Sequence, residues 1–537
     1  KKIDKSIVNC EVIYKQRDID VLARKLLRSK LVSVNIIADG KSASKAAILG
    51  FSFVTGLNSV WYVPVIDEEP KDETPNKDNV LLVLKKLKPF FENDKVLKTG
   101  YNIKYDLHLL RRFGINSSGY IFDISIAAHL LNPTSKAPSL KSLSLEYLNY
   151  EIFGIEDLFS AAKNQQNICD IPLEDISNYS SEQSLKIFEL TQILRDKLEK
   201  KSLYDYFDRV ELPLVPILVE MEYNGVYVDS NLIGQMSKDV GRKLRNLKKN
   251  IYKQSEKDFN INSTQQLGII LFDELGLPMI KKRSTAEDVL KKLRNYHDIP
   301  QLILDYRKYS KLKNTYLDSL LKLVQQKTSR IHSTFNQTTA ATGRLSSTKP
   351  NFQNIPIRTT EGREIRKAFS AQKAGWKIFS ADYSQVELRI MAHFSGDKAL
   401  INAFNNEEDI HTRTASLVFN VPVGDVLPDM RRTAKIVNFG IMYGAGPFRL
   451  SKELGIPRNE AEQIIVDYFK KYPGIQQYMN NTLEKARNLQ YVETILGRRR
   501  PILEANSSNA LRRKAAERIA INMPIQGSAA EMIKLAM

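Results

Sequence analysis

Cysteine is scarce in this sequence, and long apolar runs are missing. Only Cys10 and Cys169 occur among 537 residues. Two cysteines cannot build a disulfide framework, and they lack the spacing of a metal site, which favours a reduced, intracellular compartment. No apolar run approaches the roughly 20 residues that a membrane-spanning helix needs, and residues 1–11 lack the apolar centre of a secretion signal. We therefore expect no membrane partner.

Acidic residues are in deficit as well. The chain has 80 Lys and Arg against 61 Asp and Glu, a formal net charge of +19 and a pI of about 9.5. Such an excess favours a polyanionic partner, because basic side chains neutralise phosphates and release their counterions. Lysine-rich proteomes also produce basic proteins, so charge alone does not establish nucleic-acid binding.

The length predicts more than one domain. Single cores stop growing near roughly 250–300 residues, and this chain has 537. Apolar runs at 31–34, 46–54 and 60–65 predict strands, whereas 139–200 is mostly helical in pattern. The first 195 residues are therefore expected to form an α/β unit with its own core.

The remainder of the chain is mainly helical in pattern. Residues 196–325 are helical and lysine-rich, with a basic, polar stretch at 279–285 that predicts a flexible tip. Strand-like segments return at 331–335 and 376–381, and helical patterns dominate from 387 onward. No internal repeat or low-complexity tract interrupts this order.

The first candidate site is the segment SADYSQVELR at 380–389. A predicted strand at 377–380 ends close to Asp382, and a helical pattern begins five residues later. A carboxylate at a strand end is well placed for Mg²⁺, which prefers one or two carboxylates together with waters and substrate phosphates. An ordinary turn aspartate is the alternative for Asp382 taken alone.

The second candidate site is a stripe of four side chains. Arg431, Lys435, Phe439 and Tyr443 follow one another at intervals of four. Four residues advance a helix by about 400°, so these side chains share one slowly drifting face. Cations can hold a triphosphate, and aromatic rings can stack on a base. The alternative is a solvated basic end that runs into a buried aromatic end.

The third candidate site is a pair of polar segments, TGRLSS at 342–347 and PNFQNIP at 350–356. Arg, Asn and Gln side chains in such segments can contact phosphates and base edges. A plain loop between two strands is the alternative.

Together and in this order, the three segments resemble the family A DNA polymerases, of the large (Klenow-type) fragment of bacterial DNA polymerase I. The resemblance runs from about residue 30 to the end, and motifs of this length and order are specific. It extends over EGR at 361–363, DIH at 409–411, YVET at 491–494, GRR at 497–499, ER at 517–518 and NMPIQGSAA at 522–530.

The resemblance implies roles at the metal and phosphate end of a polymerase site. Asp382 and the Tyr383 carbonyl would bind two catalytic Mg²⁺ ions, which activate the primer 3′-hydroxyl and hold the triphosphate. Arg431, Lys435 and His411 would bind the phosphates of the incoming nucleotide. Lys435 would also give a proton to the leaving pyrophosphate.

Further roles concern the sugar, the bases and the DNA. By resemblance, Phe439 would pack on the incoming sugar and base, and Tyr443 would stack near the template base. Glu387, with Gln385 beside it, would exclude a 2′-hydroxyl. The residues implied to contact primer–template DNA are Arg344, Asn351, Gln353, Arg518, Asn522 and Gln526.

The implied fold is α/β plus α+β and multidomain. An RNase H-like 3′–5′ exonuclease-type domain at 1–195 would precede a right-hand polymerase domain at 196–537. Within the second domain we expect the thumb at about 220–325, the palm at about 326–390 and 505–537, and the fingers at about 391–504. Thumb lysines such as Lys248, Lys249, Lys281 and Lys282 are expected to meet the duplex backbone.

The sequence departs from the family pattern near its end. The family carries a second metal-binding Asp in a His-Asp-Glu motif downstream of the segment matched at 522–530, and this sequence stops at Met537 before it. One carboxylate cannot readily hold two Mg²⁺ ions roughly 3.5–4 Å apart. We therefore expect the natural protein to continue. A molecule that truly ended there is expected to bind DNA but to polymerise poorly.

A second departure affects the exonuclease-type domain. The family's first exonuclease motif offers two carboxylates two residues apart, where this sequence has Asn35 and Ile37. Its third motif has a Tyr followed four residues later by an Asp, where Tyr179 is followed by Gln183. Only Asp106, in the well-matched segment NIKYD, remains of four metal-binding carboxylates. We therefore expect this domain to fold without appreciable exonuclease activity.

The preferred function is a monomeric DNA polymerase that uses primer–template DNA and dNTPs in replication and repair gap filling. A 3′–5′ exonuclease and a non-catalytic primer–template-binding fragment are the alternatives. A single-subunit RNA polymerase is a fourth possibility, against which Glu387 and Gln385 argue. The expected location is a bacterial cytoplasm, at the nucleoid, or a plastid-type organelle.

Overall fold

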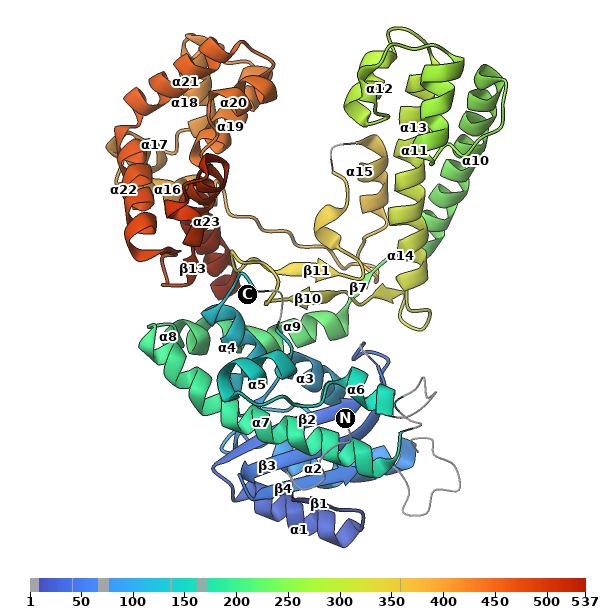
Figure 1. Ribbon diagram of the computed structural model, residues 1–537, viewed down its shortest axis with the longest axis vertical. Helices are drawn as coiled ribbons and strands as arrows, with labels where there is room; N and C mark the ends of the chain where they lie inside the picture. Colours follow the sequence, from blue (N-terminus) through green and yellow to red (C-terminus); the bar gives the residue numbers. More distant parts are fainter. Residues whose placement is uncertain are drawn as a thin grey trace. The chain divides into compact units, whose positions relative to one another are not determined.

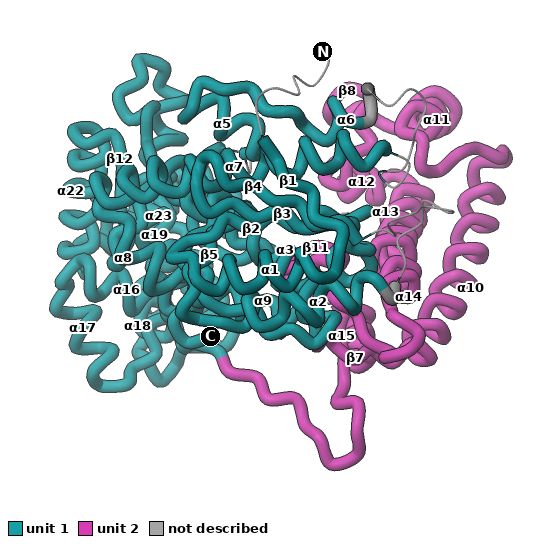
Figure 2. Tube along the Cα trace, turned by 90° about the horizontal axis from the view of Figure 1, so that it is seen from below, with its two compact units in different colours: residues 1–223, 336–346, 382–537 teal, residues 224–335, 347–381 magenta. Residues whose placement is uncertain are grey.

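The computed structural model describes residues 9–40, 42–65, 77–135, 138–161, 168, 171–357 and 359–537. The chain folds as two compact units (Figure 2). Unit 1 comprises residues 1–223, 336–346 and 382–537, and unit 2 comprises residues 224–335 and 347–381. The predicted palm is divided between the two units, and the predicted domain bounds remain predictions.

Cys10 is a free thiol, and Cys169 lies outside the described residues.

The N-terminal part of unit 1 is built on a six-stranded mixed sheet. The strands are β1 (Cys10–Val12), β2 (Leu31–Ala38), β3 (Ile48–Gly56), β4 (Ser59–Pro64), β5 (Leu97–Gly100) and β6 (Tyr120–Asp123), in the order β1-β4-β3-β2-β5-β6. β2 pairs antiparallel with β3 and parallel with β5. The predicted strands at 31–34, 46–54 and 60–65 are thereby confirmed.

Helices cover both faces of this sheet, which explains why its strands are mostly apolar and buried on both sides. Helices α1 (Gln16–Leu27) and α2 (Lys77–Phe91) pack into the core on one face, and α7 (Leu173–Lys200) lies across the other (Figure 1). Successive residues of β2 face opposite sides of the sheet. Val34 is in the core with α1 and α2, whereas the Ser33 hydroxyl donates to the Ser184 carbonyl of α7 at 2.7 Å.

Shorter helices complete this part of unit 1. They are α3 (Ile103–Arg111), α4 (Ile124–Leu131), α5 (Leu140–Leu148), α6 (Ile155–Ala161), α8 (Tyr204–Tyr206), the π-helical turn η2 (Phe207–Glu211) and α9 (Leu212–Asn224). Asp123 caps α4, because its carboxylate accepts hydrogen bonds from the backbone amides of Ser125 and Ile126 at 2.7 and 3.2 Å. A second apolar core joins α4, α7, η2 and α9.

The C-terminal part of unit 1 is almost entirely helical, as predicted from 387 onward. Its helices are α16 (Val386–Ser395), α17 (Lys398–Asn405), α18 (Ile410–Phe419), α19 (Pro428–Met442), α20 (Pro447–Leu454), α21 (Arg458–Lys471), α22 (Pro473–Leu489) and α23 (Ala510–Ala536), with short 3₁₀ turns at η6 (Val423–Asp425) and η7 (Leu503–Asn506). Strands β12 (Tyr491–Glu493) and β13 (Arg499–Pro501) form an antiparallel pair between α22 and α23. One core of buried side chains joins α16 to α22 and reaches α23 at Ile525 and Ala529.

Unit 2 consists of helices with short strands. It contains β7 (Val226–Tyr227), α10 (Ser230–Ser255), α11 (Thr264–Ile269), η3 (Ile270–Glu274), β8 (Ile280–Arg283), α12 (Glu287–Leu293), α13 (Ile299–Lys311), η4 (Leu312–Leu317), α14 (Asp318–Leu323), β9 (Arg330–Ile331), η5 (Phe352–Asn354) and α15 (Thr360–Lys367). Strands β10 (Thr334–Asn336) and β11 (Ser346–Thr348), each of which contains residues of both units, form a two-stranded sheet. No helix of the described residues is long and apolar enough to cross a membrane.

The strand predicted at 376–381, including its core at 377–380, is wrong. The segment has no regular secondary structure, and its apolar side chains are exposed, to 61% for Ile378 and 90% for Phe379. A strand needs a neighbour that accepts and donates backbone hydrogen bonds. No described residue pairs with this segment, so its apolar run has no sheet to join.

Candidate functional site

The predicted four-residue stripe lies on α19. Arg431, Lys435 and Phe439 are spaced along this helix, and Tyr443 is the residue at its C-terminal end. Arg431 and Lys435 are exposed, whereas Phe439 and Tyr443 are half-buried. The ring centroids of Phe439 and Tyr443 are 5.9 Å apart, and Lys435 Nζ lies 5.9 Å from the Phe439 centroid. The shared helical face, cationic at one end and aromatic at the other, is therefore confirmed.

The cationic end of the stripe contacts the start of α18. Arg431 Nε donates to Asp409 Oδ2 at 2.6 Å. Asp409 also caps α18, accepting from the backbone amides of His411 and Thr412 at 2.9 and 3.2 Å. Partial burial raises the Asp409 pKa, but the Arg431 guanidinium and these amides outweigh it and lower the pKa below its ordinary value. Asp409 therefore stays ionised and orients Arg431.

His411, predicted to bind phosphate, is almost fully buried at 3% exposure. Its Nδ1 lies 3.0 Å from Asn438 Nδ2, and Asn438 Oδ1 accepts from the Thr414 hydroxyl at 3.0 Å. Since the Asn438 oxygen is engaged, its amide donates to Nδ1, and the ring proton is on Nε2. Burial lowers the His411 pKa to about 4, so a neutral ring can serve the phosphates only as a hydrogen-bond donor.

Asn438 is a site residue that the sequence did not single out. It lies on the buried side of α19, between the predicted positions Lys435 and Phe439. Its amide links α19 to α18 through His411 and Thr414. The only signal in the sequence is a polar residue at a position that the stripe places toward the core.

Two predicted residues from distant segments, Arg344 and Tyr443, meet at Glu387, near the start of α16. Arg344 Nη2 donates to Glu387 Oε1 at 2.5 Å, and the Tyr443 hydroxyl donates to Oε2. Burial and the neighbouring Glu387 raise the Tyr443 pKa well above its ordinary value, so the phenol stays protonated and keeps donating. The structure thus joins the aromatic end of the stripe to the predicted sugar-discriminating carboxylate.

The side chain of Gln385 is close to the start of the same helix. Gln385 has a φ of 53° and immediately precedes α16. Its Oε1 is buried and has no hydrogen-bond partner among the described residues. A buried acceptor without a partner costs free energy unless a ligand or water satisfies it.

Three of the predicted DNA contacts share one face of α23. Arg518, Asn522 and Gln526 follow at intervals of four, and Asn522 Oδ1 is a second buried acceptor without a partner among the described residues. A Cβ on Gly444, at the end of the stripe, would lie 3.5 Å from Arg518 Cγ. The end of α19 therefore approaches the α23 face closely.

Two further predicted DNA contacts, Asn351 and Gln353, belong to unit 2, whereas Arg344 belongs to unit 1. The Asn351 carboxamide oxygen accepts from the Gln353 backbone amide at 3.0 Å and so caps η5. This bond fixes the loop conformation through Asn351.

Two sequence families match the chain. The model of "DNA polymerase family A" matches residues 230–537, and that of "3'-5' exonuclease" matches residues 10–199. The chain belongs to DNA polymerase family A.

Family members of known sequence and structure resemble almost the whole chain. DNA polymerase I of Pseudomonas aeruginosa is 40% identical over 99% of this chain and 59% of that protein. DNA polymerase I of Bacillus subtilis is 41% identical over 93% of this chain and 55% of that protein. The chain thus spans somewhat more than half the length of these curated relatives.

A solved structure of the family also superimposes. It is described as the POL domain of Pol1 from M. smegmatis in complex with DNA primer-template and dNTP, and it matches with a TM-score of 0.83 and 33% identity. The match covers 98% of this chain and 87% of that chain. An exonuclease-type domain followed by a family A polymerase domain is thereby confirmed as the architecture.

Family A polymerases are metal-dependent, and the described residues of this member provide few metal ligands. Asp382 and Tyr383 are exposed. No group of three or more His, Cys, Asp or Glu side chains that could hold a metal ion occurs in the described part of the chain. Asp382 would therefore be one carboxylate of a metal site, and by itself it does not fit a complete two-ion centre.

In the exonuclease-type domain of this family member, the two positions predicted for the first metal motif are engaged in contacts within the protein. Ile37 is 6% exposed and packs in a cluster that includes Leu49, Tyr62 and Leu158. Asn35 Nδ2 donates to the Ser180 hydroxyl at 3.3 Å. Neither side chain can supply the carboxylate oxygens that Mg²⁺ prefers.

The remaining motif positions of that domain are also engaged in its packing. Gln183 Nε2 donates to the Phe153 carbonyl at 2.8 Å, and Tyr179 packs at the edge of the Ile37 cluster. Asp106 is 4% exposed, and burial together with the nearby Asp123 raises its pKa well above the ordinary value. Burial therefore disfavours the charged form of Asp106, the carboxyl that the sequence predicts to remain of the motif set.

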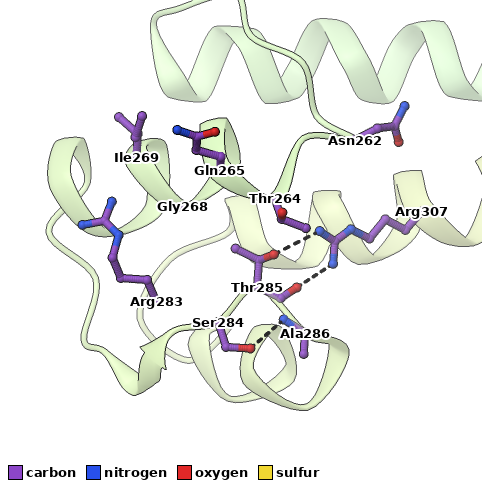
Figure 3. Close-up of a pocket in the computed structure, with 10 residues that line it drawn as sticks. All are labelled: Asn262, Thr264, Gln265, Gly268, Ile269, Arg283, Ser284, Thr285, Ala286 and Arg307. Atoms are coloured by element: carbon purple, nitrogen blue, oxygen red, sulfur yellow. Dashed lines mark hydrogen bonds between the residues drawn. The ribbon is translucent and has the colours of Figure 1, made fainter.

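A polar pocket in unit 2 was not predicted. A cavity of about 850 Å³ lies between α11, α13 and the residues before α12 (Figure 3). Arg307 donates to the Thr285 carbonyl at 2.6 Å across one side of it, while Arg283 is paired with Asp273 at 2.6 Å. The basic stretch 279–285 thus contributes both a pocket wall and the exposed strand β8.

Proposed function

We propose that this protein is a template-directed DNA polymerase that adds dNTPs to a primer 3′-hydroxyl during replication and repair gap filling. The observation that carries this proposal is the joining of three segments: the α19 stripe meets Glu387 and Arg344 through Tyr443, beside the α23 face of Arg518, Asn522 and Gln526. The family membership and the relatives named DNA polymerase I support it. So does the likeness to a Pol1 domain described with DNA primer-template and dNTP.

In this proposal the phosphates of the dNTP bind at the cationic end of α19. Arg431 and Lys435 are exposed cations one helical turn apart, suited to charge-assisted hydrogen bonds with phosphate oxygens. His411 adds a neutral donor from Nε2. Asp409 holds the Arg431 guanidinium in place, so less side-chain entropy is lost when the nucleotide binds.

The base and the sugar would bind at the aromatic end. Phe439 offers a half-buried ring for the sugar and base, and Tyr443 offers one beside the template base. Glu387 is held by Arg344 and Tyr443, so its carboxylate has a fixed position against which a 2′-hydroxyl would clash. DNA synthesis is therefore favoured over RNA synthesis.

Two Mg²⁺ ions are the proposed cofactors, with Asp382 and the Tyr383 carbonyl as protein ligands. When bound, such ions activate the 3′-hydroxyl and stabilise the negative charge that develops on the phosphates. Among the described residues, Asp382 belongs to no group of three or more potential metal ligands. The contribution of the described residues is to bind and orient the nucleotide and the DNA.

We further propose that the exonuclease-type domain is inactive and that the protein works as a monomer in a bacterial cytoplasm, at the nucleoid. Ile37, Asn35 and Gln183 are engaged in packing or protein hydrogen bonds in place of three carboxylates. Release of nucleotides from a single-stranded 3′ end by the Asp382→Asn variant, with Mg²⁺ present, would contradict the inactive domain.

Primer extension by the full-length protein tests the polymerase function. Wild type is expected to extend a matched primer–template with dNTPs and Mg²⁺, and Asp382→Asn to bind the same DNA with unchanged affinity but extend it at least about a thousandfold more slowly. Fluorescence anisotropy measures the binding. If wild type binds primer–template but does not extend it, the non-catalytic binding module becomes the correct function.

A further inference from the structure

A buried carboxylate outside both matched regions connects four distant segments of unit 1. Glu211, at the end of η2, lies between the matched regions 10–199 and 230–537 and is 1% exposed. Its Oε1 accepts from Lys534 Nζ at 2.6 Å and from Arg498 Nη1 at 3.0 Å. Gln337 Nε2 donates to its Oε2 at 2.9 Å. One side chain thus joins α23, the β12–β13 turn and the start of the segment 336–346.

The Arg498 guanidinium depends on this carboxylate for its orientation. Arg498 is itself 1% exposed, and its Nε and Nη2 have no hydrogen-bond partner in the described part of the chain. The bond from Nη1 to Glu211 is therefore the polar contact that orients the guanidinium. Burial alone would raise the Glu211 pKa, but Lys534 and Arg498 lower it to about 2, so the carboxylate remains charged at any physiological pH.

Arg498 in turn lies directly against the backbone of Gly343. A Cβ on Gly343 would come within 3.1 Å of Arg498 Nε and 3.3 Å of Cζ. Gly343 also has a φ of +84°, a conformation that other residues rarely adopt. On the other side of the loop, a Cβ on Gly527 would lie 3.3 Å from the Thr342 carbonyl oxygen. The loop 342–343 is therefore fixed between Arg498 and α23.

The next residue of that loop is Arg344, which holds Glu387. We infer that Glu211 is a positioning residue of the nucleotide site: through Arg498 and Gly343 it fixes the loop from which Arg344 orients the sugar-discriminating Glu387. Glu211 touches neither nucleotide nor DNA in this role. The inference rests on the proposed function, because it assigns Glu211 to the selectivity of the same site.

The selectivity between dNTP and rNTP is the quantity to measure. We expect Glu211→Gln to lower the ratio of kcat/KM for a dNTP to kcat/KM for the matching rNTP by about fivefold or more. A loss of folded protein lowers both values equally and leaves this ratio unchanged, so the ratio separates positioning from simple destabilisation. The full-length protein is assayed on a primer–template at a temperature well below the melting temperature of the protein.

A second variant reaches the loop without touching the buried charges. Gly343→Ala places a methyl group against Arg498 and is expected to lower the same ratio of dNTP to rNTP use. This variant keeps the inference testable if Glu211→Gln folds poorly. The matched control is Glu222→Gln, which removes a carboxylate of 8% side-chain exposure paired with Lys104, on α9 and α3. We expect this control to keep the wild-type ratio within about twofold.

The possible outcomes are distinct. A reduced ratio in Glu211→Gln and Gly343→Ala, with Glu222→Gln unchanged, supports the inference. An active wild type whose ratio is unaltered in both loop variants overturns the inference alone. A wild type that does not extend primers overturns the proposed function, and the inference with it.

Discussion

The Arg344 guanidinium and the Glu387 carboxylate form an ion pair at 2.5 Å, although 43 residues separate them in the chain. Glu387 is the more enclosed partner, with a side-chain exposure of 12% against 50% for Arg344. Because Tyr443 donates to the second carboxylate oxygen, both oxygens of Glu387 are engaged. A carboxylate held at two points has a fixed position, which its proposed role against the sugar of a bound nucleotide requires.

Replacing Glu387 should weaken the discrimination between deoxyribose and ribose in the incoming nucleotide. We expect Glu387→Ala to lower the preference for dNTP over rNTP by at least about tenfold, because nothing then opposes the 2′-hydroxyl. Steady-state kcat/KM for the two nucleotides on one primer–template measures it. Glu462→Ala, at an exposed position of α21, is the control. An unchanged preference in Glu387→Ala would mean that another side chain selects the sugar.

Loss of a cation from α19 should weaken nucleotide use and leave DNA binding unchanged. A hydrogen bond to a charged group contributes about 1.5–3 kcal/mol, so Lys435→Ala should lower kcat/KM for dNTPs roughly 10- to 150-fold. Single-nucleotide insertion kinetics give this value. Arg432→Ala, one position off the stripe and with a side chain 79% exposed, should stay close to wild type. Equal effects of both variants would contradict the stripe as the phosphate site.

The stripe itself could be predicted because helical spacing is a local property. Residues at i, i+4, i+8 and i+12 share a face wherever the helix lies. The face of Arg518, Asn522 and Gln526 follows the same rule on α23. By contrast, the partners of Glu387 and the Glu211 network connect segments that are far apart in sequence, and no local pattern encodes such contacts.

The strand predicted at 376–381 failed for a related reason. Its apolar residues fit a strand, but strands are stabilised by a paired neighbour, and none is present among the described residues. His411 shows the same limit at a single residue: the motif DIH predicts it as a site residue, whereas its burial against Asn438, and hence its neutral ring, follows from tertiary packing.

Glu531 of α23 should give the protein a pH-dependent stability near neutrality. Its carboxylate accepts from the Thr494 hydroxyl and from the Leu496 amide, yet burial raises its pKa to about 7. A folded-state pKa above the unfolded value stabilises the fold at low pH. That contribution, at most about 3 kcal/mol, is lost as pH rises through 7.

We therefore expect the melting temperature of the wild type to fall between pH 6 and pH 8 more steeply than that of Glu531→Gln, whose amide does not titrate. Thermal unfolding at half-unit steps of pH provides the comparison. Glu517→Gln, on the same helix and paired with Arg487, should retain the slope of the wild type. Parallel curves for wild type and Glu531→Gln would show that Glu531 is already ionised at pH 6.

The exonuclease-type domain should resist restoration of its metal motif. Ile37 is 6% exposed among apolar side chains, so Ile37→Glu buries a carboxyl group without a partner. We expect a loss of several kcal/mol in the free energy of unfolding of this domain, with Ile37→Val losing about 0.5–1.5 kcal/mol as the control. Limited proteolysis at increasing denaturant concentration, followed by cleavage within residues 10–199, measures both losses of stability. If Ile37→Glu is as stable as Ile37→Val, the region around residue 37 admits water, and the packing argument for an inactive exonuclease fails.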